Sequence, residues 1–412
     1  MKVSSVMLER FMSVQVAPEN VVGRDRLIER IWKRLERDSL RFTAERRIGK
    51  TTVMVKMKAE PKDGYEVLFL ELEGIDSPER FTELIFNRIK PLLSKKDKAM
   101  KWWNDFRKST GGTELGGLIK LPNLSNMAWQ TTLQKMFEGL CEHQADKKIL
   151  FLMDELPYML QKIASASNEQ KTLALTLLDT LRSIRQSHKN NLRMIFAGSV
   201  GLHHVINDLK ADRLASEPVN DMPAIEIHAL NDSDAIVLAK RLIQQDQIEI
   251  SGDEDDFYQR LVELTDAVPF YLEKVCIRLE ELERPVSIVD AETAIQHQLT
   301  TAQDPWEMEH FRGRLKIYYS GSLVAADGQK IAKAEIATNL LDSLSVEKAP
   351  RSIEEIWGMV KAKYSLTSRQ VVVEMLSSLA LDHYLISDTD KKYSFRFPLI
   401  KQWWRLAQGI EV

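Results

Sequence analysis

Residues 44–52 read Ala-Glu-Arg-Arg-Ile-Gly-Lys-Thr-Thr, between a short apolar-leaning segment at 39–43 and a periodic run at 53–57. A strand, a loop and a helix in this order predict a phosphate-binding loop. Gly49 lets the backbone bend so that successive N–H groups face an anion. Lys50 places a positive charge beside the terminal phosphates, and the Thr51 hydroxyl can complete the coordination shell of Mg²⁺. The dipole of the following helix adds attraction for the anion.

The loop departs from the pattern G-x-x-x-x-G-K-[ST] at its first position, where Ala44 replaces glycine. Alanine fits a tight turn there only if its φ angle stays negative. From these residues alone, a chance Gly-Lys-Thr at the start of a helix stays open as the alternative. The residues predicted to bind the nucleotide here are Arg46, Arg47, Ile48, Gly49, Lys50, Thr51 and Thr52.

A second segment, residues 148–155, reads Lys-Ile-Leu-Phe-Leu-Met-Asp-Glu. A nearly continuous apolar run that ends in two acids is typical of a buried parallel strand whose carboxyl end carries charge to a crevice. We expect Asp154 to hold Mg²⁺ with Thr51, and Glu155 to orient or deprotonate the water that attacks the γ-phosphate. The alternative is a solvated acidic turn, since Leu156-Pro157 follows, but the preceding loop favours a site for ATP and Mg²⁺.

A third apolar segment, residues 192–199, ends in Ala-Gly-Ser. If this strand lies beside the acid-bearing one, the Ser199 hydroxyl can contact the γ-phosphate or the attacking water. An ordinary strand-to-loop turn that uses glycine and serine is the alternative. The adjacent His203 and His204 point about 100° apart on a helix, so we expect a structural or solvated role for them.

The bulk composition is that of an ordinary globular protein, with 44% hydrophobic and 28% charged residues. A length of 412 residues predicts two or three domains. A net charge of −3 gives no general attraction to nucleic acid or to an anionic membrane. The two cysteines, Cys141 and Cys276, lie in apolar helical patterns and predict buried free thiols in a reducing compartment. With no long apolar run, we expect a cytoplasmic protein without a membrane contact.

Strands alternate with helices through the first half of the chain, which predicts an α/β fold: a P-loop parallel sheet with helices on both faces. An N-terminal arm at 1–19 precedes this ATPase core at 20–228, which contains an insertion at about 94–126 with a hairpin or flap at 111–119. Residues 229–303 predict a helical lid. Three helices and a polar-tipped hairpin at 304–412 predict a winged helix-turn-helix, reached through a connection at about 304–320.

Several motifs follow one another in the order found in a known family: Val-Gly-Arg-Asp at 22–25, Arg-Arg-Ile-Gly-Lys-Thr at 46–51, Asp-Glu-Leu-Pro at 154–157, Ala-Gly-Ser-Val-Gly-Leu at 197–202 and Val-Pro-Phe-Tyr-Leu at 268–272. With the C-terminal winged helix, the chain resembles prokaryotic P-loop ATPases of the AAA-related, archaeal-ATPase-like group. These are related to the signal-transduction ATPases with numerous domains (the STAND class) and to the origin-recognition initiators. The resemblance covers about 20–404.

The resemblance implies roles for further residues. Ser199 corresponds to the sensor at the neighbouring strand end, and Pro269 to the lid proline near the base or ribose, although Ala267 stands where the family often has glycine. The family motif beside the nucleotide corresponds to Val22, Gly23 and Arg24. No arginine finger is assigned; Arg182 and Arg185 are the candidates, with a solvated helical role as the alternative.

A winged helix could contact DNA or a protein partner. The candidate contacts are Ser368, Arg369, Gln370, Lys391 and Lys392. Nearby acids, among them Glu374 and Asp388, dilute the positive surface, so protein docking is as well supported as DNA reading.

We therefore expect an ATP-binding and hydrolysing switch that couples its nucleotide state to a separately encoded effector, as the resemblance implies for prokaryotic signalling or antiviral defence. A homo-oligomer is compatible with this function. Two alternatives stay open: a DNA-binding initiator- or transposition-type ATPase, and a nucleotide-binding scaffold with negligible turnover, which the replacement at Ala44 keeps in consideration.

Overall fold

The structure is a computed structural model that describes residues 17–93, 101, 104–105, 113–115, 118–120, 128–144, 146–165, 167–198, 201–210, 217–326, 328–366 and 368–410. The described residues fall into two compact units that meet in sequence between Ile227 and His228. No helix in these ranges is both long enough and apolar enough to cross a membrane.

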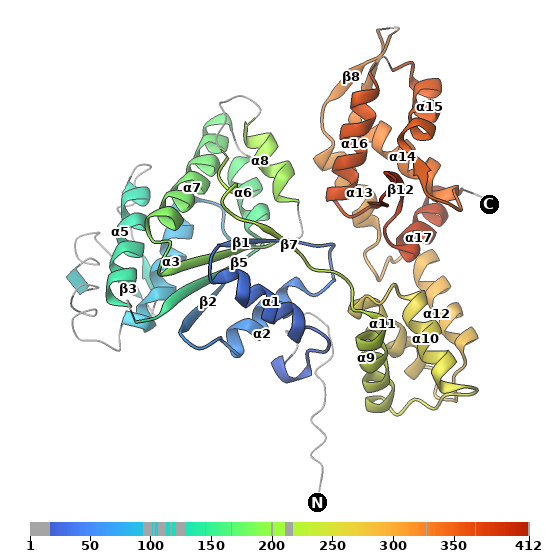
Figure 1. Cartoon of the computed structure of the whole chain (residues 1–412), viewed down its shortest axis with the longest axis horizontal. Coiled ribbons are helices and arrows are strands. Elements are labelled where there is room, and N and C mark those ends of the chain that lie inside the picture. Colours follow the sequence, from blue (N-terminus) through green and yellow to red (C-terminus); the bar gives the residue numbers. More distant parts are fainter. Residues whose placement is uncertain are drawn as a thin grey trace, which may run out of the picture. The chain divides into compact units, whose positions relative to one another are not determined.

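The first unit is built on a five-stranded sheet in the order β2-β5-β6-β1-β7 (Figure 1). Its strands are β1 (Leu40–Thr43), β2 (Tyr65–Glu71), β5 (Lys148–Asp154), β6 (Leu192–Phe196) and β7 (Ala224–Glu226). All of its pairings are parallel. The α/β fold predicted from the alternation of strands and helices is therefore confirmed. Because β6 lies between β1 and β5 and the three strands are parallel, their carboxyl ends lie side by side at one edge of the sheet.

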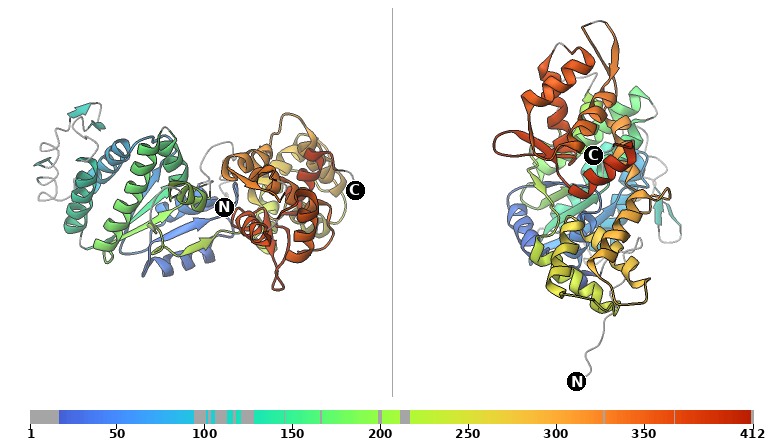
Figure 2. Two further views of the ribbon diagram at one scale, coloured as in Figure 1. Left: turned by 90° about the horizontal axis from the view of Figure 1, so that it is seen from above. Right: turned by 90° about the vertical axis from the view of Figure 1, so that its right-hand side faces the viewer.

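Helices cover both faces of this sheet, as predicted (Figures 1 and 2). One face carries α3 (Pro78–Leu93), α5 (Ala128–His143), α6 (Leu156–Ala164), α7 (Asn168–Ser187) and α8 (Leu202–Lys210), which share one buried apolar cluster with β2, β5 and β6. The other face carries α1 (Asp25–Leu35) and α2 (Lys50–Ala59) (Figure 1). The short helix η1 (Pro18–Asn20) precedes α1. In α1, Ile28, Ile31, Trp32 and Leu35 are buried at helical spacing, and the Trp32 ring packs against the Tyr65 ring in a tilted arrangement, with ring centroids 5.0 Å apart.

The insertion in the core contains the predicted hairpin strands. β3 (Thr113–Leu115) and β4 (Leu118–Lys120) pair antiparallel, with Thr113 opposite Lys120. Residues 1–16 of the predicted N-terminal arm at 1–19 lie outside the described residues. Both cysteines are buried free thiols, as predicted.

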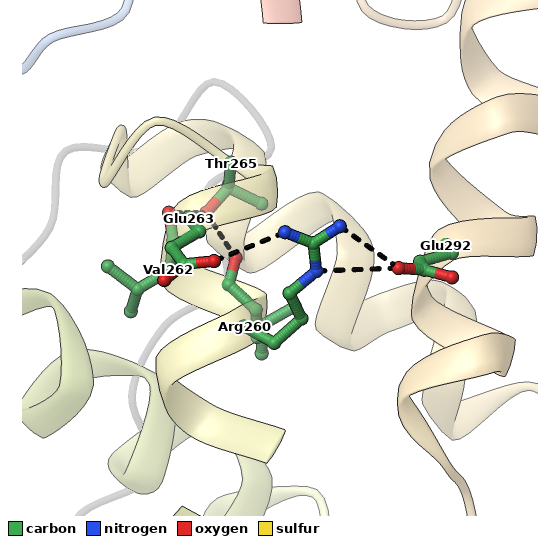
Figure 3. Close-up of polar contacts among 6 residues, drawn as sticks. Arg260, Val262, Glu263, Thr265 and Glu292 are labelled. Atoms are coloured by element: carbon green, nitrogen blue, oxygen red, sulfur yellow. Dashed lines mark hydrogen bonds and ion pairs between the residues drawn. The ribbon is translucent and has the colours of Figure 1, made fainter. Parts of the chain in front are cut away.

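The second unit begins with four helices, α9 (Asp232–Gln245), α10 (Glu254–Leu264), α11 (Pro269–Glu280) and α12 (Ile288–Thr300). Each buries one stripe of apolar side chains, as the sequence periodicity predicts. Arg260 on α10 bridges Glu263, at 3.1 Å, and Glu292 on α12, at 3.3 Å (Figure 3). Because these side chains are about half exposed, the bridges contribute little stability, on the order of 0–1 kcal/mol; apolar burial holds the four helices together.

The rest of the second unit contains α13 (Glu309–Tyr318), the hairpin β8 (Ser322–Val324) and β9 (Lys330–Ala332), α14 (Lys333–Val346), β10 (Arg351–Ser352), α15 (Ile353–Tyr364), α16 (Arg369–Leu381), β11 (Leu385–Ser387), β12 (Lys392–Phe395) and α17 (Pro398–Gln408). A three-stranded antiparallel sheet has the order β10-β12-β11.

Two features of this region differ from the sequence-based expectation. The predicted connection at about 304–320 is mostly helical, because Phe311, Arg314 and Leu315 bury one side of α13. The terminal helix α17 was not predicted at all. Its two tryptophans are packing residues: Trp403 is 4% exposed, and Trp404 is 1% exposed and donates its Nε1–H to the Asp342 carboxylate at 2.9 Å.

Asp266, between α10 and α11, should give the second unit a pH-dependent stability. Burial raises the pKa of Asp266 from 3.8 to about 7, and the N–H of Leu399 opposes this only in part. The folded state therefore binds the proton more tightly than the unfolded chain. The stabilisation from this tighter proton binding is fully present below the pKa that Asp266 has in the unfolded chain, and it is lost as pH rises through 7. We therefore expect the free energy of unfolding to increase as the pH falls from about 8 to about 5, by at most about 1.4 kcal/mol per pH unit.

Urea unfolding followed by tryptophan fluorescence checks this expectation. Asp266→Asn is the matched variant, because it keeps the size and the acceptor oxygen but does not titrate. The wild-type protein should gain stability relative to this variant as the pH falls. Parallel pH profiles of the two proteins would contradict the assignment.

Candidate functional site

The loop between β1 and α2 has the geometry that an anion cradle requires. Gly49 precedes the first residue of α2 at φ 103°, a left-handed conformation that side chains rarely adopt. Arg47 is also left-handed, at φ 68°, whereas Ala44 keeps a negative φ. Because its φ angle is negative, Ala44 fits the first position of the loop, and the turn forms there without glycine.

Two cations hold this loop from opposite ends. The Lys50 side chain is 7% exposed, and its Nζ donates to the carbonyl oxygens of Ala44, at 3.3 Å, and Glu45, at 3.1 Å. The buried guanidinium of Arg24 donates to the Ile48 carbonyl at 2.6 Å. These contacts fix three carbonyl groups of the loop beside the two cations.

The structure brings the two predicted Mg²⁺ ligands together across 103 sequence positions. Thr51, in the first turn of α2, donates its hydroxyl to Asp154 Oδ2 at 2.6 Å. Asp154 ends β5 and is 4% exposed. Burial raises the pKa of Asp154, while the Thr51 hydrogen bond and the Lys50 charge oppose that rise. A hydroxyl and a carboxylate at one point are the hard oxygen donors that Mg²⁺ prefers.

Glu155 follows β5 in a left-handed conformation, at φ 57°, and occupies the N-cap position of α6 without a side-chain capping hydrogen bond. The ends of β5 and β6 are joined by hydrogen bonds from Ala197 N to Met153 O, at 2.9 Å, and from Leu156 N to Ala197 O, at 3.1 Å. A Cβ on Gly198 would lie 3.4 Å from Glu155 Oε2. The Glu155 carboxylate is therefore held beside the end of β6, on the same edge of the sheet as Asp154.

Gly198 is required by this close approach. A Cβ there would lie 2.6 Å from Pro157 Cδ and 2.9 Å from its Cγ, closer than real contacts allow. We expect Gly198→Ala to lower the free energy of unfolding by about 1–3 kcal/mol, because the start of α6 must shift. Gly74→Ala, whose Cβ would meet nothing within 4 Å, is the matched control. Denaturant unfolding measures both, and equal stabilities would show that the β5–β6 edge is not tightly packed.

The other predicted residues of the loop region lie near these groups in the chain. Val22 and Gly23 precede Arg24 and are partly buried, as are Arg46 and Arg47. Thr52 lies in the first turn of α2. Ser199 lies outside the described residues, so its sensor role stays a prediction. Pro269 opens α11 in the second unit, and its predicted contact with the base or ribose also stays a prediction.

The candidate partner-contacting residues are all exposed, but two of them already have acidic partners. Arg369 donates to Glu354 at 2.7 Å, and Gln370 donates to Glu374 at 3.2 Å. Ser368 precedes α16, Lys391 lies in the turn between β11 and β12, and Lys392 is the first residue of β12.

Arg185, one of the two arginine-finger candidates, has a structural role instead. It is 3% exposed, pairs with Asp221 at 2.8 Å, donates to the Pro218 carbonyl at 2.8 Å and lies over the Phe196 ring. These partners lie in the same unit as Arg185, so the contacts give its guanidinium a structural role there. Arg182 is partly buried on the same helix.

Sequence reasoning missed two acids close to the site. Glu71, the last residue of β2, is in register with Asp154, and its charge contributes to the raised pKa of Asp154. The parallel arrangement predicted from the alternation could have indicated it, since the carboxyl ends of parallel strands, that of β2 included, lie at one edge of the sheet. Glu45 is 3% exposed, and its side chain accepts a hydrogen bond from Arg46 N at 2.7 Å. Glu45 lies inside the loop, where no periodic hydrophobic pattern indicates which side chains are buried.

No family model and no curated protein matches the chain. Among solved structures, the Walker-type ATPase PABY2304 of Pyrococcus abyssi superimposes with a TM-score of 0.61 at 16% identity, covering 94% of this chain and 97% of that one. This chain has the fold of the P-loop ATPases. The Aeropyrum pernix ORC2 protein, solved as ADPNP–ADP complexes, has a TM-score of 0.51 at 10% identity, with 99% and 96% of the two chains covered. At these identities the P-loop ATPase likeness is one of fold, and it agrees with the resemblance drawn from the motifs.

Proposed function

We propose that this chain binds and hydrolyses ATP and uses the nucleotide state as a switch. The observation that carries the proposal is the 2.6 Å contact between Thr51 Oγ1 and Asp154 Oδ2, which joins the loop after β1 to the acid that ends β5. A structural role alone would not require a buried carboxylate at this edge, because burial of a charge is unfavourable. The fold of ATPases, including one solved with ADPNP and ADP, supports this choice of ligand.

Each residue has a distinct part in the proposed reaction. The N–H groups of the loop and Lys50 bind the β- and γ-phosphates, and the Lys50 ammonium exchanges its loop carbonyls for phosphate oxygens. Thr51 and Asp154 hold Mg²⁺, which when bound neutralises charge on the phosphates. Glu155 accepts a proton from the attacking water, or orients it, at the edge where β5 and β6 end.

We further propose that the four helices α9–α12 act as a lid, and that α14–α16 with the sheet β10-β12-β11 form a winged helix-turn-helix. Helices followed by an antiparallel hairpin support the second assignment. The acidic partners of Arg369 and Gln370 reduce the positive surface available to DNA phosphates, so a protein effector fits this face better. Such a switch would serve signalling or antiviral defence in a prokaryotic cytoplasm.

Phosphate release from ATP by the purified chain tests this function. We expect slow hydrolysis that requires Mg²⁺ and stops with EDTA. A fluorescent ATP analogue should bind and be displaced by ADP. Failure of both nucleotides to bind would refute the proposal, and a duplex affinity that falls steeply with added salt would favour the DNA-binding alternative.

A further inference from the structure

The turn between α10 and α11 has an unusual backbone. Asp266 and Ala267 are consecutive left-handed residues, at φ 52° and 51°, and neither is glycine. The turn is closed by hydrogen bonds from Asp266 N to Glu263 O, at 3.2 Å, and from Ala267 N to Val262 O, at 3.0 Å. Since α11 begins two residues later, at Pro269, the conformation of this turn sets the position of the first turn of α11.

The Asp266 side chain leaves this turn and contacts a helix far along the chain. Its Oδ2 accepts a hydrogen bond from the Leu399 N–H at 2.8 Å, across 133 positions. Leu399 is the second residue of α17, and its N–H has no partner within the helix. Pro398, the first residue, has no N–H, so Leu399 provides the first free donor of α17. One contact therefore joins a partly buried carboxylate to an orphan helix amide, and the helix dipole strengthens it.

Other contacts join the same two groups of helices. Gln402 on α17 donates to the Gln296 side chain on α12 at 3.0 Å. The Tyr271 ring on α11 packs against Trp306, with centroids 5.1 Å apart, and its hydroxyl contacts Met308 Sδ at 3.4 Å. Trp306 is 1% exposed and precedes α13. The lid helix α11 is thus held at two places, by α17 through Asp266 and by the segment before α13 through Tyr271.

We infer that Asp266 is a latch that makes the lid helices α9–α12 and the C-terminal helices α13–α17 move as one body. A displacement of α11 by nucleotide would then be delivered directly to α17, because the Asp266 turn lies between them. Among the contacts of this junction, the Asp266–Leu399 bond is the one in which loss of the side chain leaves a buried backbone N–H unpaired. The latch itself does not depend on ATP; only its use in signalling rests on the proposed function.

Two substitutions at position 266 separate the carboxylate from the backbone conformation. Asp266→Gly removes the acceptor but tolerates the positive φ, and Asp266→Asn keeps an acceptor oxygen in a residue that also tolerates it. We expect hydrogen exchange of the α17 amides in nucleotide-free protein to become about tenfold faster in Asp266→Gly, with α14 and the first unit unchanged. Asp266→Asn should stay close to wild type.

Unchanged α17 exchange in Asp266→Gly would overturn the inference, as would equal acceleration throughout the second unit, which indicates general destabilisation. If Asp266→Gly is not recovered folded, Asp266→Ser, whose side chain is too short to reach Leu399, takes its place. With ADPNP added, α17 exchange should change in wild type but not in Asp266→Gly. A protein that shows the nucleotide-free difference but no response to ADPNP would retain the latch and refute the ATP switch, so the two failures are distinguishable.

Discussion

Lys50→Ala is expected to weaken ATP binding at least about a hundredfold, equivalent to about 3 kcal/mol. The ammonium is almost fully buried and lies against the carbonyls of Ala44 and Glu45, so it is already placed within the loop that would surround the β- and γ-phosphates. Its loss removes the charge that pairs with the phosphates and also two contacts that shape the loop. Titration with a fluorescent ATP analogue measures the affinity directly.

Lys56→Ala is the matched control for this prediction. Lys56 lies on the same helix and is also almost buried, at 9% exposure, but it donates to the Pro18 carbonyl at 3.2 Å and pairs with Glu60. Its removal should lower stability and leave ATP affinity nearly unchanged. If Lys50→Ala binds ATP as wild type does, or if both variants lose affinity equally, the loop is not the phosphate site.

The first unit could be predicted from sequence because its signals are local. The apolar run that forms β5 ends in Asp154, and the run that forms β6 is followed by Ala-Gly-Ser. The Gly-Lys-Thr at the start of α2 needs only a left-handed Gly49. Parallel strands and helices on both faces follow from the alternation alone. The sequence did not show that β6 separates β1 from β5, since strand order depends on packing between distant segments.

The second unit shows where sequence reasoning ended. The helix α17 packs through Leu399, Ile400, Trp403 and Trp404, a pattern too short to be separated from a tail with two tryptophans. The Asp266–Leu399 contact joins residues 133 positions apart and has no periodic signal in either segment. Arg185 could be taken for an exposed helical arginine from the sequence, but it is buried against Asp221 and Pro218, partners that only the folded chain brings to it.

Glu155→Gln is expected to reduce ATP hydrolysis by about 10²–10⁴-fold while ATP affinity changes little. The amide keeps the size and the position beside Gly198 but cannot accept a proton from the attacking water. Neither Thr51 nor Lys50 depends on this side chain for its contacts with Asp154 and the loop carbonyls. Steady-state phosphate release and binding of the ATP analogue, measured on the same preparation, separate catalysis from affinity.

Glu71→Gln is the control that decides which carboxylate acts as the base. Glu71 is in register with Asp154, so it also lies at the edge where the phosphates are expected, but it comes from β2 rather than from the start of α6. If Glu155 is the base, Glu71→Gln should change turnover by less than about tenfold, mainly because it removes a charge that raises the pKa of Asp154. The reverse result would assign the base to Glu71. If wild type and both variants release phosphate at the same near-zero rate while still binding ATP, the chain is a nucleotide-binding scaffold, and the acids at this edge serve only to hold the metal and the loop.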